Sequence, residues 1–162
     1  VFRTHCDTEI IPHLWEDHQE GMFEHLKGQF GIALWDRKRD LVILARDRFG
    51  ICPLFYAQHD GWLLFGSEIK AILASGMIGA RPDLRGIDQA FNFFSIPGPA
   101  TCFQGVTALQ PGQSLRIDRR AARGGAPRPR GAGPAGMAPR APPRGGGGAR
   151  GGGAPRRAGD PR

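Results

Sequence analysis

The composition of the chain changes abruptly after Asp118, and this break constrains the fold more than any single motif. The 44 residues from 119 to 162 contain 13 Gly, 11 Arg, 10 Ala and 8 Pro, so four residue types supply 42 of them. Every aromatic residue and every His lies before residue 119. A segment so poor in large apolar side chains cannot bury enough surface to offset its conformational entropy. The sequence therefore predicts one domain over residues 1–118 and a disordered, low-complexity tail over residues 119–162.

The net charge divides at the same place. Residues 1–118 contain 11 Lys+Arg and 14 Asp+Glu, a net charge of −3, whereas the tail contains 11 Arg and one Asp, a net charge of +10. Two explanations of the tail stay open. Its Arg-Gly-Gly triplets, which begin at Arg123, Arg144 and Arg150, are similar to disordered arms that bind nucleic acid by charge and stacking. Alternatively, the codons of Gly, Ala, Pro and Arg can consist of G and C alone, so a GC-rich gene translated in a shifted frame gives this composition. We favour the shifted frame, because nucleic-acid-binding arms usually also carry aromatic or polar residues for contact.

Several classes of protein are disfavoured by what the sequence lacks. No run of about 18 apolar residues occurs, so no membrane span and no membrane partner are predicted. Cys6, Cys52 and Cys102 are widely spaced and form no CxxC pair, which favours a reduced, cytoplasmic setting. The five His do not cluster at the spacing of metal ligands, so no metal site is predicted. No general phosphate-loop, nucleophile-elbow or zinc-protease motif occurs.

The first 118 residues alternate between helix and strand patterns. Apolar periodicity and turn residues predict a first helix capped by Asp7 or Thr8, further helices over 20–26, 67–73 and 87–94, and strands over 30–35, 41–45, 54–57, 62–65 and 114–117. Asp60-Gly61 is a favoured turn between two antiparallel strands. Strands with little polar alternation indicate sheets that are covered on both faces. The pattern is typical of an α+β domain built on antiparallel sheets.

Five sequence segments occur in the order and at the spacing of one enzyme family. They are 5–11 (HCDTEII), 30–36 (FGIALWD), 44–54 (LARDRFGICPL), 64–71 (LFGSEIKA), and the pair 97–99 (PGP) and 109–112 (LQPG). Together they resemble the glutaminase domain of glutamine-hydrolysing asparagine synthases, which are class II glutamine amidotransferases. The resemblance covers residues 2–117.

The resemblance implies both a fold and a reaction. The fold is the N-terminal-nucleophile hydrolase type, an αββα sandwich of antiparallel sheets, here incomplete. The family hydrolyses glutamine to glutamate and ammonia. A second, C-terminal synthase domain activates aspartate with ATP and Mg²⁺, and the ammonia then gives asparagine. The full-length enzyme would be a cytoplasmic ligase that can form a homodimer. The phosphate-binding SGGxDS motif of the synthase domain does not occur in this sequence, so we expect no cofactor in this chain.

The resemblance assigns one site residue and no catalytic residue. The family nucleophile is a Cys at the mature N-terminus, whereas Val1 is not a nucleophile and Cys6 aligns with a non-catalytic position. The Arg that holds the substrate carboxylate and the Asn-Gly-Glu oxyanion segment belong before this sequence, so we expect the chain by itself to be inactive. Asp7 matches the Asp that binds the ammonium group of glutamine, a charge-assisted contact. The alternative is that Asp7 only caps a helix, and the five-segment context favours substrate binding.

The remaining family residues are interpreted as scaffold. We expect Arg46 and Asp47 to hold a turn through an ion pair and through bonds from their side chains to the backbone, and Ser67 to cap a helix. Two other functions stay open. One is a different class II amidotransferase that aminates a sugar or another carboxylate, and the other is a nucleic-acid-binding protein that acts through its tail.

Overall fold

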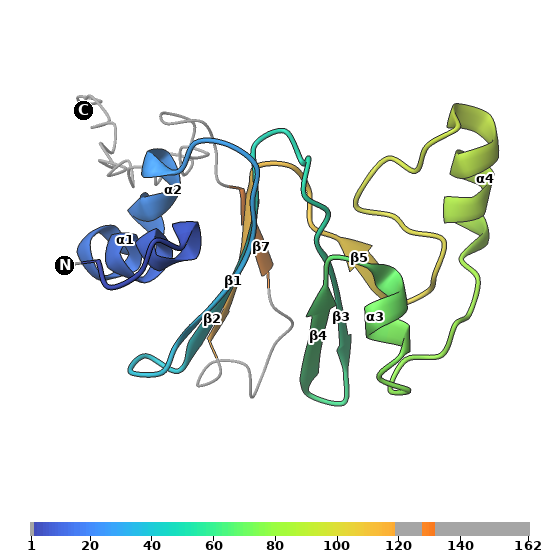
Figure 1. The fold of residues 1–162 in the computed structure, drawn as a ribbon. Helices are drawn as coiled ribbons and strands as arrows, with labels where there is room; N and C mark the ends of the chain where they lie inside the picture. The colour runs from blue at the N-terminus through green and yellow to red at the C-terminus, as the bar shows by residue number, and fades with distance from the viewer. Residues whose placement is uncertain (1, 119–127, 132–162) are drawn as a thin grey trace, which may run out of the picture.

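Two antiparallel sheets lie at the centre of the structure, with helices outside them (Figure 1). The computed structural model describes residues 2–118 and 128–131. The first sheet has the strand order β1-β2-β6-β7 and the second has the order β4-β3-β5. The strands are β1 Gly31–Asp36, β2 Leu41–Arg46, β3 Phe55–His59, β4 Trp62–Gly66, β5 Val106–Ala108, β6 Gln113–Asp118 and β7 Arg128–Gly131.

The helices occur at the two ends of the molecule. They are the 3₁₀ turn Asp7–Glu9, α1 Ile10–His18, the 3₁₀ turn Gln19–Gly21, α2 Met22–His25, α3 Ile69–Leu73 and α4 Leu84–Phe93. The helices α1 and α2 lie beside the first sheet, while α3 lies beside the second and α4 stands beyond it (Figure 1). None of the helices in the described part of the chain is long and apolar enough to cross a membrane.

The side chains of β2 show how the layers are stacked. Leu41, Ile43 and Ala45 point to one face, where they pack in a cluster with Trp15 of α1 and Met22 of α2. The alternate β2 residues point to the opposite face, because successive side chains of a strand alternate between its faces.

That opposite face packs against the second sheet. Leu44 and Leu115 of the first sheet share a core cluster with Leu54 and Leu109, and Tyr56 of β3 packs against it. The far face of the second sheet carries Ala57 and Val106, which cluster with Ile72 of α3. The order of layers is therefore helix, sheet, sheet and helix.

The structure confirms most of the elements expected from the sequence. The first hairpin, β1 to β2, pairs Gly31 with Arg46 and Asp36 with Leu41. The second, β3 to β4, turns at Asp60-Gly61, where both residues have positive φ, as a tight two-residue hairpin turn of this type requires. The predicted α+β class with two antiparallel sheets is confirmed.

Three local predictions are wrong. Ser67 does not cap a helix, because α3 begins at Ile69 after an extended Glu68 and no side chain caps it. The helix predicted over 87–94 begins earlier, at Leu84, where the side chain of Asp83 accepts the backbone N–H of Arg85. The sheets are also not covered throughout, since Trp35 of β1 and Trp62 of β4 are 58% and 64% exposed.

Most of the predicted tail lies outside the described residues. The prediction that the tail is disordered concerns those same residues. The exception is the backbone of Arg128–Gly131, which forms β7 and pairs antiparallel with β6. Residues 113 to 116 of β6 are opposite 131 to 128 of β7 in this pairing. β6 ends at Asp118, and the domain boundary placed there stays a prediction.

Candidate functional site

Asp7, the one residue assigned to a substrate, lies on the surface at the start of the 3₁₀ turn before α1. Its Oδ1 atom lies 3.7 Å from the Sγ atom of Cys6, a weak thiol donor. The alternative role as a helix cap is wrong for Asp7, because the cap residue of α1 is Glu9 and the turn that contains Asp7 begins after Cys6, in both cases without a side-chain cap bond. The carboxylate is therefore exposed and keeps acceptor capacity for a ligand.

The neighbouring carboxylate of Glu9 folds the preceding segment back against α1. It accepts the backbone N–H groups of Arg3 at 2.6 Å and Thr4 at 2.7 Å, and it also accepts the hydroxyl of Thr4. The hydroxyl of Thr4 is the largest influence that lowers the pKa of Glu9, followed by the N–H of Arg3, and nearby His13 contributes too. The backbone on the N-terminal side of Asp7 is thereby held in place.

This clamp was not predicted from the sequence. Thr4 and Glu9 are five residues apart, whereas the capping signature of helix starts has a spacing of three, so the sequence carried no signal for this clamp. The bonds depend on the path of residues 3–6, where the hydroxyl of Thr4 also accepts the backbone N–H of Cys6 at 3.2 Å.

Cys6 is exposed, and no imidazole or cation contacts its thiol in the part of the chain that the structure describes. Its Sγ atom lies 2.9 Å from the hydroxyl of Thr8, and it forms no contact with an imidazole among the described residues. A nucleophilic thiol needs a base or a positive charge to raise its thiolate fraction. That Cys6 has no catalytic role stays a prediction.

The loop after β2 is held by one buried carboxylate. Asp47 has no exposed surface, and its oxygens accept backbone N–H groups from Phe49 at 3.0 Å, Ile51 at 3.1 Å, Cys52 at 3.0 Å and Phe30 at 3.4 Å. Burial alone would raise the pKa of Asp47, but the four donors outweigh it and hold that pKa below its usual value.

Arg46 completes this loop from the other side. Its guanidinium donates to the backbone carbonyl oxygens of Gly50 at 2.6 Å, Cys52 at 2.8 Å and Leu109 at 2.8 Å. The predicted bonds from these side chains to the backbone are therefore confirmed. The predicted Arg46–Asp47 ion pair is wrong, because within the described residues each charge is satisfied by backbone groups instead.

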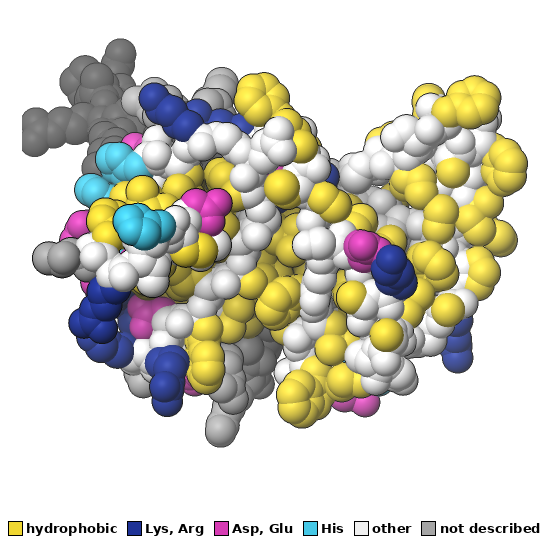
Figure 2. Space-filling model, in the orientation of Figure 1, with side chains coloured by type: hydrophobic (Ala, Val, Ile, Leu, Met, Phe, Trp, Pro, Cys, Tyr) yellow, Lys and Arg dark blue, Asp and Glu magenta, His cyan; other side chains and the backbone are white. Residues whose placement is uncertain are grey.

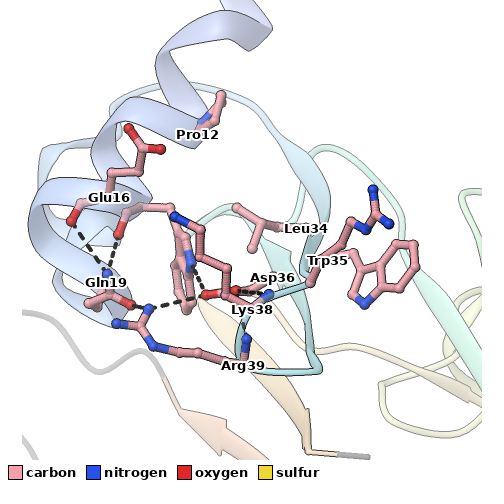
Figure 3. Close-up of a pocket in the computed structure, with 10 residues that line it drawn as sticks. Pro12, Glu16, Gln19, Leu34, Trp35, Asp36, Lys38 and Arg39 are labelled. Carbon is pink, nitrogen blue, oxygen red and sulfur yellow. Dashed lines mark hydrogen bonds and ion pairs between the residues drawn. The ribbon is translucent and has the colours of Figure 1, made fainter.

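An open groove of about 700 Å³ lies between the end of α1 and the hairpin of β1 and β2 (Figure 3). At its base the Oδ2 atom of Asp36 accepts the indole N–H of Trp15 at 2.9 Å and the guanidinium of Arg39 at 3.1 Å. Arg39 also donates to the side chain of Gln19. The indole of Trp15 is the largest influence that lowers the pKa of Asp36.

The groove is separate from the residue assigned to glutamine. Asp7 is not among the residues that line it. The polar side chains at the base of the groove bind one another, while Trp35 points away from the cluster in Figure 3. We therefore interpret the groove as the packing of α1 on the hairpin. Among the residues that the structure describes, no group of three or more His, Cys, Asp or Glu side chains is placed to hold a metal ion.

Two antiparallel sheets packed face to face between helical layers define the chain as an α+β sandwich domain. The model of the glutamine amidotransferase domain matches residues 1–126, so the chain belongs to that family. This confirms the class inferred from the five sequence segments.

Curated relatives agree with this assignment. Glutamine-hydrolysing asparagine synthetase 3 of Bacillus subtilis (strain 168) is 40% identical over 119 residues, which are 73% of this chain and 19% of that protein. Glutamine-hydrolysing asparagine synthetase 2 of the same organism is 45% identical over 74 residues, 46% of this chain and 10% of that protein. Amidase chyE of Penicillium rubens is 39% identical over 114 residues, 67% of this chain and 16% of that protein. The chain thus spans a fifth or less of the length of these relatives.

Proposed function

We propose that residues 1–118 are part of the glutaminase domain of a glutamine-hydrolysing asparagine synthase. The observation that carries the proposal is the 40% identity to asparagine synthetase 3 of Bacillus subtilis, which extends over 119 residues. In the whole enzyme this domain would release ammonia from glutamine. A synthase domain would use ATP and Mg²⁺ to activate aspartate, and the ammonia would convert it to asparagine in the cytoplasm.

The fold supports the same proposal. The order helix, sheet, sheet and helix is the order of layers in an N-terminal-nucleophile hydrolase sandwich. The buried bonds of Arg46 and Asp47 fix the loop between the two sheets, so the sheets hold a defined relation to each other. Such a scaffold is suited to holding residues of a small-molecule site in place.

Within this proposal, Asp7 binds the α-ammonium group of glutamine. The carboxylate is exposed, and its one described contact is with the weak thiol donor of Cys6. A charge-assisted bond to an ammonium group would distinguish glutamine from amides that lack the amino group. The clamp at Glu9 supports the role, because it holds the backbone next to Asp7.

The test of Asp7 compares two ligands that differ in one group. Amide NMR spectra of the 162-residue chain are recorded during titration with glutamine and with glutaramate, which lacks the α-amino group. We expect glutamine to shift the resonances around Asp7 at lower concentrations than glutaramate does. Asp7→Asn should abolish the difference, whereas Asp60→Asn, an exposed carboxylate in the β3–β4 turn, should preserve it. Equal shifts from both ligands in the unchanged chain would refute the role of Asp7.

The 162-residue chain is expected to release no ammonia from glutamine, because the resemblance places the nucleophile and the oxyanion donors outside it. A coupled ammonia assay on the purified chain measures this directly. Release of ammonia above the level of a heat-denatured sample would contradict the assignment of no catalytic residue.

A second candidate is an amidotransferase with a different acceptor. The observation in its favour is that relatives named as amidases match nearly as well, at 37% and 39% identity. An assay of the intact gene product with amide-labelled glutamine, aspartate, ATP and Mg²⁺ distinguishes the two candidate functions. Labelled asparagine would support the synthase, and labelled ammonia without labelled asparagine would support another acceptor.

The tail has its own test because its residues belong to neither proposal. Nucleic-acid binding by the Arg-Gly-rich segment should weaken steeply with salt, since it depends on the release of counterions. A filter-binding assay at two salt concentrations, with and without residues 119–162, measures it. Translation of the gene in the other two frames after codon 118 tests the shifted-frame explanation, which fails if neither frame continues the family sequence.

A further inference from the structure

Hydrogen bonds hold the backbone on both sides of Asp7. After Asp7, the N–H of Ile10 donates to the carbonyl of Asp7, which joins it to the start of α1. Before Asp7, the carbonyl of Cys6 accepts the N–H of Glu9 at 3.1 Å. The carboxylate of Asp7 is exposed at this joint and has the thiol of Cys6 as its described contact. The position of this carboxylate therefore depends on the path of the backbone over residues 4–9.

The hydroxyl of Thr4 ties this path together. It donates to the carboxylate of Glu9 and accepts the backbone N–H of Cys6 at 3.2 Å. A hydroxyl can form both bonds at once, because it has one donor and two acceptor lone pairs. Thr4 thus connects the carboxylate at the start of α1 to the residue immediately before Asp7, although no hydrogen bond joins Thr4 to Asp7 among the described residues.

The segment before Thr4 is also attached to α1. The ring of Phe2 lies edge-on to the imidazole of His13, with 5.0 Å between the ring centroids. The Nε2 atom of His13 lies 3.8 Å from the carboxylate of Glu9. Side chains of His, Asp and Glu gather at the end of the molecule that carries α1 and α2, whereas the end at α4 is mainly apolar (Figure 2). A small charged ligand would therefore approach Asp7 over a polar surface.

We propose that Thr4 and Glu9 are positioning residues, which hold Asp7 where it can select ligands that carry an ammonium group. This role rests on the proposed binding of ammonium by Asp7, and it adds the residues that determine how selective Asp7 is. Glu9 already accepts three hydrogen bonds, so the ammonium group would bind Asp7 and not Glu9. A carboxylate already held in place binds more tightly than one that must be ordered by the ligand, because ordering costs free energy.

A purely structural role of Glu9 is the alternative. Glu9 would then only stabilise the start of α1, and its loss would lower stability without changing which ligand is preferred. The two roles differ in the ratio of the dissociation constants for glutaramate and glutamine, because these ligands differ only in the α-amino group. A loss of stability alone affects both constants equally and leaves their ratio unchanged.

The experiment measures this ratio by amide NMR titration of the 162-residue chain and its variants. Thr4→Val keeps the shape of the side chain but removes the hydroxyl, whereas Thr4→Ser keeps the hydroxyl. We expect Thr4→Val and Glu9→Ala each to reduce the ratio by about twofold to tenfold, the cost of ordering one side chain on binding. Thr4→Ser should keep the ratio of the unchanged chain. So should the control Glu16→Ala, which removes an exposed carboxylate of α1 outside the clamp.

Urea unfolding shows whether each variant is folded under the titration conditions, and the two Thr4 variants keep the test valid if Glu9→Ala disturbs α1. An unchanged ratio in both Thr4→Val and Glu9→Ala would overturn the positioning role, while a ratio abolished by Asp7→Asn would leave the proposed role of Asp7 intact. An equal loss in Thr4→Ser and Thr4→Val would overturn it too, because the hydroxyl would then have no effect. Equal dissociation constants in the unchanged chain would refute the roles of Asp7 and of the clamp together.

Discussion

Replacement of the buried Asp47 by Asn removes a charge while keeping the shape of the side chain. In the structure one carboxylate oxygen accepts the N–H groups of Phe49 and Ile51, and the other accepts those of Cys52 and Phe30. Asn keeps a single acceptor oxygen, so its amide N–H₂ would face two of the four donors. Two backbone N–H groups would lose their partner beside a side chain that has no exposed surface.

The expected loss follows from the number of bonds. A hydrogen bond to a charged group contributes about 1.5–3 kcal/mol, and the two bonds that remain would lose their charge assistance. We therefore expect Asp47→Asn to lower the free energy of unfolding by about 3–5 kcal/mol. Because whole domains are stable by only about 5–15 kcal/mol, the variant should be close to unfolding.

The assay is equilibrium unfolding in urea, followed by the fluorescence of the three Trp residues. Asp60→Asn is the matched control, since its carboxylate is 84% exposed in a turn and the same charge is removed. We expect the control to change the free energy of unfolding by less than about 0.5 kcal/mol. A loss of less than about 1 kcal/mol in Asp47→Asn would refute the argument that this carboxylate organises the loop.

The pH dependence provides a second readout of Asp47. Its pKa is lowered in the folded protein, so the folded state favours the ionised carboxylate. The stabilisation is complete above the unfolded-state pKa of about 3.9 and disappears as the pH falls through the lower folded-state pKa. The difference in stability between the unchanged chain and Asp47→Asn should therefore shrink in acid. A difference that stays constant down to the acid limit of folding would contradict this assignment.

Three further substitutions test the scaffold by urea unfolding. Arg46→Lys should cost about 2–3 kcal/mol, because an ammonium group cannot reproduce the three bonds of the guanidinium fork, and an unchanged midpoint would contradict that role. Gly86→Ala should cost about 1–3 kcal/mol, although Ala favours helices, since its Cβ would lie 2.0 Å from the carbonyl oxygen of Thr101; a gain in stability would show that the contact relaxes freely. Leu115→Ala, fully buried between the sheets, should cost about 2–5 kcal/mol, and a loss below 1 kcal/mol would argue against face-to-face packing.

Short-range signals explain which parts of the fold could be predicted. The second hairpin follows from Asp60-Gly61, because a turn that needs positive φ at both residues has few alternative sequences. The start of α4 could not be predicted in the same way. Gly86 interrupts the helical pattern, and its reason is a close approach to Thr101, fifteen residues away. β5 was missed because three residues are too few to show an alternating pattern.

The side-chain partners were harder to predict than the elements. Arg46 and Asp47 are adjacent and of opposite charge, which suggested that they pair with each other. In the structure the loop buries backbone N–H and C=O groups that have no strand partner, and such groups must be satisfied. The carboxylate of Asp47 therefore accepts the backbone N–H groups, and the guanidinium of Arg46 donates to the backbone carbonyl oxygens. Sequence alone does not reveal which backbone groups a loop buries.

The contacts of the carboxylates in the five family-like segments distinguish Asp7 from the other acids of these segments. These segments contain five acids: Asp7, Glu9, Asp36, Asp47 and Glu68. Four of them already have bonding partners. Backbone N–H groups donate to Glu9 and Asp47, and an indole and a guanidinium donate to Asp36. The ammonium of Lys70 lies 2.5 Å from the carboxylate of Glu68. A carboxylate already bound by donors would have to give up at least part of those bonds to bind an external ammonium group. Asp7, exposed and contacted by a thiol, would not, and this favours Asp7 among the acids of these segments.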